Sequence, residues 1–304
     1  MTGAATAVVF PGQGTQSPGM GSTWLDRPEW DSVVMRAEAA LDEPLGWLVL
    51  DADETTLGRT RNAQLAVLLT SLMVWESIRA ALVPTAFAGH SLGQVTALIA
   101  AGVLTFEDGI RFAARRADRT QAAADARPGV MAALLGATLE QAEAGCSASD
   151  ECWIANDNAP GQIVLAGTRQ GLTLGTDAAR AAGARTARTL AVGGAFHTPL
   201  MDSAADGLAA DLAAIALHDP VAPVVSNADG VAYSDSEGWR ERSARHVAVP
   251  VRWRLVQPRL VELGAERVLE VGHGSILAAL AKRTIPNTPV LGIATPADLV
   301  KAFA

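Results

Sequence analysis

The pentapeptide GHSLG at residues 89–93 has the residue types of a serine nucleophile on a tight turn. Ser91 supplies the hydroxyl oxygen, and Gly89 and Gly93 lack the side chains that a sharp strand-to-helix turn would exclude. A serine at the start of a helix also lies beside backbone N–H groups that can bind an oxyanion. The pattern therefore predicts nucleophilic acyl chemistry at Ser91, with an ordinary turn as the alternative.

A serine nucleophile needs a base to accept its proton, and the chain has five histidines. His90 directly precedes Ser91, so its side chain projects in a different direction. His218 stands in LHDP, at the predicted end of a helix, where we expect a surface or helix-end role. His197 lies in a glycine-containing loop before a predicted helix, a common place for a catalytic side chain. Spacing alone does not choose between His197 and His246.

The elements around the pentapeptide fit a strand-to-helix turn, because a short apolar run precedes it and a helical pattern follows it. Apolar runs and their periodicity predict strands at 4–10 and 85–88 and helices at 62–82, 92–101 and 106–126. Gly102 is a typical helix stop. We therefore expect an α/β fold with a large α/β hydrolase-like domain.

The pattern changes between residues 128 and 193, where shorter elements follow one another as strand, helix, strand, strand, helix, strand. The predicted strands are 130–136, 153–156, 162–166 and 185–191, with a polar loop after 156, and the predicted helices are 139–144 and 172–182. This order is that of a split βαβ, ferredoxin-like unit. We predict a small ferredoxin-like domain at 128–193, inserted into a large domain formed by 1–127 and 194–304.

The C-terminal third continues with a long helix, a strand, an arginine-rich helix and a final strand-helix unit. The long helix is predicted at 199–217, the strand at 221–226 and the final unit at 267–282. These segments complete the large domain.

Composition excludes several classes of protein. Of 304 residues 49% are hydrophobic, and 24 Lys and Arg stand against 32 Asp and Glu, a net charge of −8 that disfavours general binding to nucleic acid or anionic membrane. Cys146 and Cys152 have neither zinc-site spacing nor a disulfide pattern, so no metal is predicted. No signal peptide or membrane span is predicted, so a cytoplasmic protein is expected.

Several motifs in order resemble those of malonyl-CoA:acyl-carrier-protein transacylases and of the acyltransferase domains of polyketide synthases. The similar segments are FPGQGTQ at 10–16, GHSLG at 89–93, NDNAPGQ at 156–162, GAFHTPLM at 194–201, VSNADG at 225–230, PVRW at 250–253 and LEVG at 269–272. The resemblance extends from residue 8 to about 282. It implies an acyltransferase that moves an acyl group, malonyl-type favoured, from CoA or a carrier protein onto an acyl carrier protein.

The resemblance also implies roles for individual residues. Ser91 would form the acyl ester, and His197 would be its base and then its acid. The backbone N–H groups of Gln13 and Leu92 would form the oxyanion hole. No cofactor would be bound, because the phosphopantetheine thioester of CoA or of an acidic carrier protein is itself the substrate. A monomer is expected.

Substrate-binding residues follow from the same resemblance: Arg116, His246, Gln64, Thr120 and Phe196. The acid-binding arginine of the family stands in R-G-x-x-M-Q, and residues 116–121 read RADRTQ, matching at Arg and Gln only. Helical phase supports Arg116 independently, because it falls in an apolar stripe about 100° from Arg115. A buried guanidinium needs an anionic partner, either a substrate carboxylate or a core Asp or Glu.

Four departures from the family pattern bear on the choice of acyl group. His246 stands where Gln is usual, and Gln94 replaces Glu directly after the GHSLG segment. Thr120 replaces Met, and GHG at 272–274 replaces GPG. None of them is Ser91 or His197. We therefore expect acyl transfer, while the acyl group stays open.

Three alternatives remain at this point. A polyketide-pathway acyltransferase would shuttle a bulkier or amine-bearing acyl group between two carrier proteins. A serine hydrolase would share the GHSLG turn, but the segments 10–16 and 194–201 argue against a hydrolase. A catalytically inactive carrier-docking module would not need both Ser91 and His197.

Docking of an acidic carrier to a net-negative chain needs local arginines, and the candidates are Arg240, Arg242, Arg245, Arg111, Arg115 and Arg119.

Overall fold

The computed structural model describes residues 4–303, which divide into two compact units. The first unit comprises Met1–Ala114, Ile215–Glu237 and Val256–Ala304, and the second comprises Arg115–Ala214 and Gly238–Leu255. Two of the four boundaries fall inside helices, which are α7 (Phe106–Ala126) and α12 (Trp253–Glu262). Among the described residues no helix has the length and apolar composition of a membrane span.

The first unit is built on a six-stranded mixed sheet with the order β10-β9-β1-β2-β7-β8. Its strands are β1 (Thr6–Phe10), β2 (Ala86–Gly89), β7 (Val224–Val225), β8 (Ala232–Tyr233), β9 (Arg267–Val271) and β10 (Val290–Ile293). All neighbours pair in parallel except β7 and β8. The sequence TAVVF of β1 is fully buried, as expected of a central parallel strand covered on both faces.

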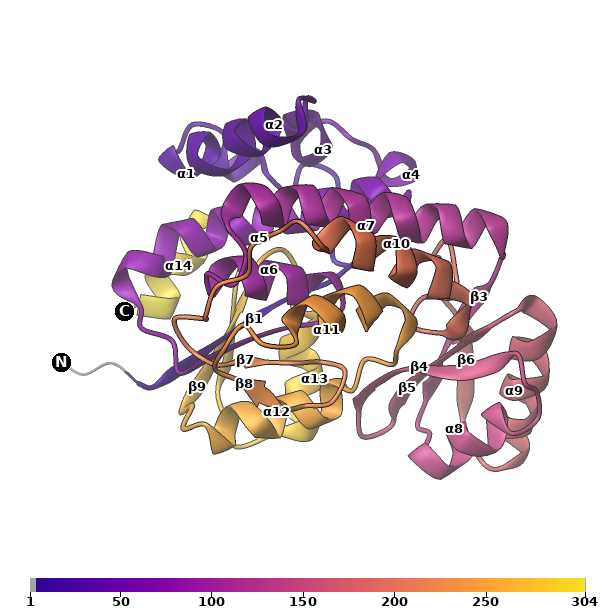
Figure 1. The fold of residues 1–304 in the computed structure, drawn as a ribbon. Coiled ribbons are helices and arrows are strands. Elements are labelled where there is room, and N and C mark those ends of the chain that lie inside the picture. Colours follow the sequence, from indigo (N-terminus) through magenta and orange to yellow (C-terminus); the bar gives the residue numbers. More distant parts are fainter. Residues whose placement is uncertain (1–3, 304) are drawn as a thin grey trace. The chain divides into compact units, whose positions relative to one another are not determined.

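Helices cover this sheet, and the longest complete one is α5 (Thr60–Ile78). The others are α1 (Pro28–Trp30), α2 (Arg36–Leu41), α3 (Gly46–Leu50), α4 (Glu54–Leu57), α6 (Leu92–Ala100), α13 (Ile276–Thr284) and α14 (Pro296–Phe303), with 3-10 turns η1 (Ser22–Trp24) and η3 (Arg79–Ala81) and a π turn η2 (Asp31–Met35). Most of α5 is buried around its whole circumference, because it is apolar on all sides. In Figure 1, α6 lies beside β1 and follows directly from β2.

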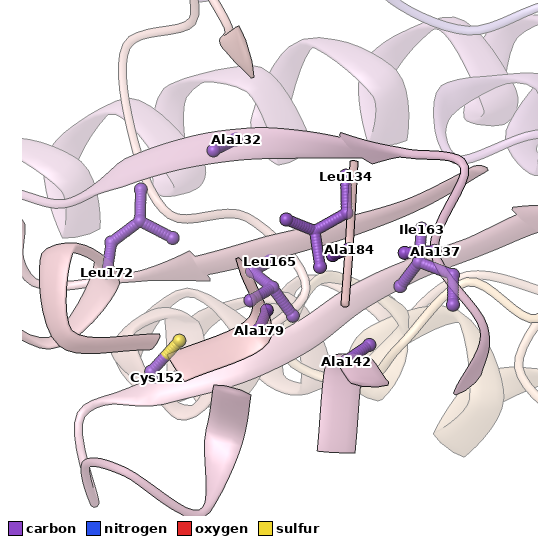
Figure 2. Packing of buried hydrophobic residues seen from close by; sticks show 10 residues of the cluster. All are labelled: Ala132, Leu134, Ala137, Ala142, Cys152, Ile163, Leu165, Leu172, Ala179 and Ala184. Atoms are coloured by element: carbon purple, nitrogen blue, oxygen red, sulfur yellow. The ribbon is translucent and has the colours of Figure 1, made fainter. Parts of the chain in front are cut away.

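The second unit contains a four-stranded antiparallel sheet with the order β4-β5-β3-β6. Its elements are β3 (Val130–Leu135), α8 (Leu139–Cys146), β4 (Cys152–Ala159), β5 (Gln162–Gly167), α9 (Arg169–Ala181) and β6 (Thr186–Thr189). Alternate strand residues such as Leu134, Ile163 and Leu165 meet Ala142 of α8 and Ala179 of α9 in one core (Figure 2). Thr138 and Gln141 form a capping box on α8, and the Thr168 side chain caps α9 by accepting from the Gly171 amide.

The remaining helices of the second unit are short. They are η4 (Pro199–Met201), α10 (Asp202–Leu212), α11 (Trp239–Arg245) and η5 (His246–Ala248). The chain after η5 is attached to β4 by backbone hydrogen bonds. The amide of Val251 donates to Ala155 at 2.9 Å, and the amide of Asp157 donates to Val251 at 2.8 Å.

The structure confirms the predicted helix at 106–126 and corrects three other segments. The expected polar loop after residue 156 is strand as far as Ala159, because pairing with β5 and a Pro160-Gly161 turn extend the hairpin through two register shifts. The helix predicted at 199–217 ends at Leu212, whose carbonyl accepts a hydrogen bond from the Arg240 side chain. The strand predicted at 221–226 has two residues, because the preceding Pro223 has no N–H to donate.

Candidate active site

Ser91 occupies the turn between β2 and α6 in a strained backbone conformation. Its φ is 52° and its ψ is −111°, outside the regions that residues with a side chain usually adopt. Among residues 4–303 only three non-glycine residues have positive φ: Asp42, Ser91 and His197. Strained backbone of this kind is typical of functional sites, and two of these three are the residues that the sequence predicts as nucleophile and base.

The loop that contains FPGQG packs directly on the serine turn through backbone atoms. The amide of His90 donates to the Phe10 carbonyl at 3.0 Å. A Cβ atom on Gly93 would lie 2.1 Å from the Phe10 oxygen, and one on Gly12 would lie 2.4 Å from the His90 oxygen. Both positions therefore require glycine, because the FPGQG and GHSLG segments approach each other closely there. This contact between the two motifs was not predicted from the sequence.

The N–H groups of Gln13 and Leu92 lie on these two interlocked segments. Leu92 is the first residue of α6, whose initial N–H groups have no acceptor inside the helix. Within residues 4–303 neither backbone N–H has a hydrogen-bond acceptor, although Gln13 is half-buried and Leu92 is buried. Such N–H groups have the capacity to bind an oxygen that becomes negatively charged.

A buried amide network holds the strand end that leads into the turn. The side-chain oxygen of Gln94 accepts hydrogen bonds from the backbone N–H of Asn227 at 3.0 Å and from its side-chain Nδ2 at 2.6 Å. The same Nδ2 group donates to the Gly89 carbonyl at 2.9 Å. The Gln that replaces the usual Glu of the family pattern thus supports the turn as a neutral acceptor. The sequence showed the replacement but not its partner.

His197, in the second unit, is held by backbone carbonyl groups. Its Nδ1 atom is 3.0 Å from the His246 oxygen and 3.2 Å from the Val249 oxygen, and its own amide donates to Val247 at 2.8 Å. A carbonyl oxygen only accepts, so Nδ1 must carry the proton. When the ring is neutral, its lone pair is therefore on Nε2, the tautomer that a general base needs.

An ion pair reinforces the segment that supplies these carbonyl groups. Arg254 places Nε and Nη2 at 2.9 Å and 2.8 Å from the Oδ2 atom of Asp157 on β4. The pair spans the same two segments as the hydrogen bonds of Val251. The chain that cradles His197 is thus fixed to the sheet of the second unit by main-chain and side-chain contacts.

His246 contributes to His197 through its backbone as well as its ring. The His246 side chain is 4% exposed, and the centroids of the two imidazole rings lie 5.4 Å apart. The His246 carbonyl contacts Nδ1 of His197, so the backbone of His246 orients the ring of His197. Sequence spacing had left the choice of base between these two histidines open.

Arg116 is 4% exposed, near the middle of α7. Burial lowers its pKa to about 10, so the guanidinium remains charged at neutral pH. The hydroxyl of Thr120 donates back to the carbonyl groups of Arg116 at 2.8 Å and Ala117 at 3.0 Å, so its proton is used inside the helix. Thr120 can offer a ligand only an acceptor lone pair.

The two remaining predicted residues are placed differently. Gln64 is 2% exposed on α5 of the first unit. Phe196 is half-buried and packs against the apolar cluster that contains Met131, Val164 and Leu200. The first unit thus contains Gln13, Gln64, Ser91 and Leu92, and the second contains Arg116, Thr120, Phe196, His197 and His246.

Most of the arginines proposed for carrier docking have intramolecular partners. Arg119 binds both oxygens of Asp211 at 3.1 Å, and Arg111 donates to the Ala40 carbonyl. Arg240 donates to Leu212, and Arg242 lies over the ring of Trp239 at 5.8 Å. The remaining pair is more accessible: Arg115 is exposed, and Arg245 has a 52% exposed side chain whose contact with Asp202 is a loose 3.8 Å. Among the described residues no three His, Cys, Asp or Glu side chains are grouped as metal ligands.

Comparison with known proteins gives the class of the chain. A family model described as the acyl transferase domain matches residues 7–297. The malonyl CoA-acyl carrier protein transacylase of Bacillus subtilis (strain 168) is 33% identical over 303 residues, covering 98% of this chain and 96% of that protein. The enzyme of the same name from Salmonella typhimurium is 34% identical and covers 98% of both.

Solved structures agree with this class. A malonyl-transacylase in complex with its type II PKS acyl-carrier protein has a TM-score of 0.93 at 33% identity, covering 98% of this chain and 99% of that chain. A malonyl-CoA:acyl carrier protein transacylase from Xanthomonas oryzae has a TM-score of 0.93 at 36% identity, covering 99% and 98%. The chain is an α/β acyl transferase. It belongs to the malonyl CoA-acyl carrier protein transacylase family.

Proposed function

We propose that this protein transfers a malonyl group from CoA to the phosphopantetheine thiol of an acyl carrier protein. The observation that carries this proposal is the full-length relation to transacylases of that activity, at 33–34% identity over 98% of the chain. The neighbour solved with its acyl-carrier protein supports the acceptor. The substrate itself brings the phosphopantetheine arm, so the reaction needs no resident cofactor.

In the first half-reaction the Oγ atom of Ser91 attacks the thioester carbonyl carbon of malonyl-CoA. Nε2 of His197 takes the hydroxyl proton, the carbon–sulfur bond breaks, and the same proton goes to the departing CoA thiolate. The Nδ1 contacts with the carbonyl oxygens of His246 and Val249 support this role, because they leave Nε2 as the basic nitrogen. Ser91 and His197 then form a dyad without a carboxylate on Nδ1.

In the second half-reaction the thiol of the carrier's phosphopantetheine attacks the malonyl ester on Ser91. His197 takes the thiol proton and returns it to the Ser91 oxygen when the carbon–oxygen bond breaks. Both tetrahedral intermediates carry a negative oxygen, and the amides of Gln13 and Leu92 are the donors we assign to it. A single donor of this kind typically contributes about 2.7–4 kcal/mol to the transition state.

A finer description of the fold accompanies this proposal. The parallel part of the six-stranded sheet with its serine turn supports an α/β hydrolase-like domain at 1–127 and 194–304. The antiparallel order β4-β5-β3-β6, with two helices on one face, supports a ferredoxin-like domain at 128–193. The two compact units are cut elsewhere, after Ala114, Ala214, Glu237 and Leu255, so these boundaries remain our proposal.

Intact-mass analysis tests the proposed reaction. Incubation with malonyl-CoA should add one malonyl group to the protein, and later addition of holo carrier protein should remove it and add it to the carrier. Release of free malonate instead of transfer would identify a hydrolase. Loading only from another acyl-carrier, and not from malonyl-CoA, would favour a carrier-to-carrier transferase. No loading by any thioester would favour an inactive docking module.

Arg116→Met should lower malonyl loading by about 10- to 100-fold, because one buried charge-assisted contact typically contributes about 1.5–3 kcal/mol. We propose that the guanidinium binds the free carboxylate of the malonyl group, supported by its burial and its retained charge. Met keeps an unbranched apolar chain in the helix and removes only the cation. Loading of acetyl-CoA, which has no carboxylate, should be unchanged or faster.

The comparison is made as single-turnover loading of Ser91 from malonyl-CoA and acetyl-CoA, in the wild type and the variant. Equal loading of the two acyl groups by the wild type would contradict the dicarboxylate assignment. An equal loss for both in Arg116→Met would show that Arg116 only supports the fold.

Arg245→Glu should raise the KM for an acidic carrier protein several-fold at low salt. Arg245 is the most accessible member of the arginine set on α11, and complementary charge steers the encounter of two proteins. The effect should shrink as salt rises, because screening acts within about 10 Å at 0.1 M. Arg180→Glu is the matched control, since Arg180 is 48% exposed on α9 in the same unit. A carrier KM that is the same in wild type and both variants would remove Arg245 from the docking surface.

A further inference from the structure

The turn between β9 and α13 packs against the loop that follows the FPGQG motif. Its residues 272–274 read GHG where the family pattern has GPG. A Cβ atom on Gly272, whose φ is 135°, would lie 3.0 Å from Cγ of Pro11 and 2.3 Å from Oγ of Ser71. A Cβ atom on Gly274 would lie 3.0 Å from Cβ of Thr15. The turn is therefore in backbone-close contact with the segment that carries Gln13.

One side-chain hydrogen bond connects the two segments. Nε2 of His273 lies 2.8 Å from Oγ of Ser17, across 256 positions of sequence. Burial lowers the pKa of His273, so the ring is neutral at physiological pH. Its other nitrogen, Nδ1, is buried and has no partner among residues 4–303. The ring thus makes one hydrogen bond, which is to the loop. Its second nitrogen has lost contact with water on burial and gains no partner among residues 4–303.

The turn between β9 and α13 is anchored by the side chain of Glu270. Glu270, on β9, is completely buried and accepts hydrogen bonds from the amides of Leu277 at 3.0 Å and Ala278 at 2.8 Å at the start of α13. These bonds fix the strand to the helix that the turn connects. His273 therefore extends from a rigid support, whereas the loop with Ser17 has neither helix nor strand between β1 and η1.

We propose that Ser17 and His273 are positioning residues that hold the 11–17 loop so that the amide of Gln13 points at the oxyanion. The inference rests on the proposed acyl transfer. In a GPG turn a proline ring would restrict the backbone but offer no side-chain donor or acceptor to the loop. In this chain a hydrogen bond connects the turn and the loop at the same place. Neither residue is assigned contact with the substrate, so their effect is on the rate of acylation rather than on binding.

Ser17→Ala and His273→Phe should each lower the maximal rate of Ser91 acylation by malonyl-CoA about three- to tenfold. The size follows from one neutral hydrogen bond, and small misplacements of a catalytic group are costly. The half-saturating malonyl-CoA concentration should not change. Phe keeps the bulk of the ring without its nitrogens, whereas His273→Gln places an amide near the Nε2 position and should restore most of the rate. The double variant should be no slower than the slower single variant.

Rapid-quench mass measurement of acyl-enzyme formation gives both constants. Ser22→Ala is the matched control, because Ser22 makes a local hydrogen bond to Gly19 just beyond the loop and should acylate like the wild type. Wild-type rates in Ser17→Ala and His273→Phe would overturn the proposal, as would a change in half-saturation alone, or a rate loss that His273→Gln does not restore. Melting temperatures separate a folding defect from a rate defect. A wild type that does not acylate would instead contradict the proposed function.

Discussion

Ser91→Ala is expected to abolish covalent loading by malonyl-CoA and to leave the melting temperature nearly unchanged. Without Oγ no ester forms, so the loss is complete rather than partial. The fold should persist because Ala has the same Cβ as Ser and adopts the same strained φ of 52° at the same cost. Intact mass after incubation with malonyl-CoA measures the loading, and thermal unfolding measures stability.

The control for this experiment is Ser226→Ala, since Ser226 is a buried serine of the same unit whose hydroxyl accepts a hydrogen bond from the Ala228 amide. It should still load malonyl. A malonyl adduct of normal yield on the Ser91→Ala protein would place the nucleophile elsewhere, and peptide mapping would then locate it.

His197→Ala is expected to slow acyl transfer by about 10²–10⁴-fold, the usual contribution of one general acid-base group. Both half-reactions need a proton moved between an oxygen and a sulfur, so acylation and transfer to the carrier should both slow. Single-turnover loading of Ser91, followed by chase with carrier protein, measures the two steps separately. The loss should appear in the rate constants and not in malonyl-CoA binding.

His246→Gln is the comparison that decides between the two histidines. It changes the ring but keeps the backbone carbonyl that accepts from Nδ1 of His197, and it introduces the residue usual in the family pattern. We expect a mild effect, within about tenfold, since the orienting hydrogen bond is retained. If His246→Gln were as damaging as His197→Ala, then the His246 ring would take part in proton transfer and our choice of base would be incomplete.

Sequence periodicity found the elements whose patterns are strong. The helix at 106–126 was predicted because apolar residues recur at a clear spacing. The same holds for the strands β3 and β6, which precede and follow the β4-β5 hairpin in the chain. The short helices between residues 28 and 57, and β10 with α14 at the C-terminal end, were not predicted. Helices of three to six residues are too short to show a period, and α14 packs on β10.

Two of the three corrections share a physical cause, which is tertiary contact overriding local preference. The polar residues 156–159 form strand because β5 and Val251 offer hydrogen-bond partners to their backbone. Helix α10 stops at Leu212 because a side chain from α11 satisfies its last carbonyl group. Val251 and Arg240 are distant in sequence from the segments that they contact, so no local pattern predicts these two contacts.

Residue types and local spacing were enough to give the class of chemistry and the buried phase of Arg116, and to propose Ser91 and a short set of histidines as catalytic residues. The orientation and tautomer of His197 came from the tertiary structure, because its Nδ1 contacts the carbonyl groups of His246 and Val249 some 50 residues away. The tertiary structure alone showed that Gly12 and Gly93 serve one backbone contact and that Ser17 meets His273. Residue identity sets what a side chain can do; the pairing of distant segments sets its orientation, protonation and partners.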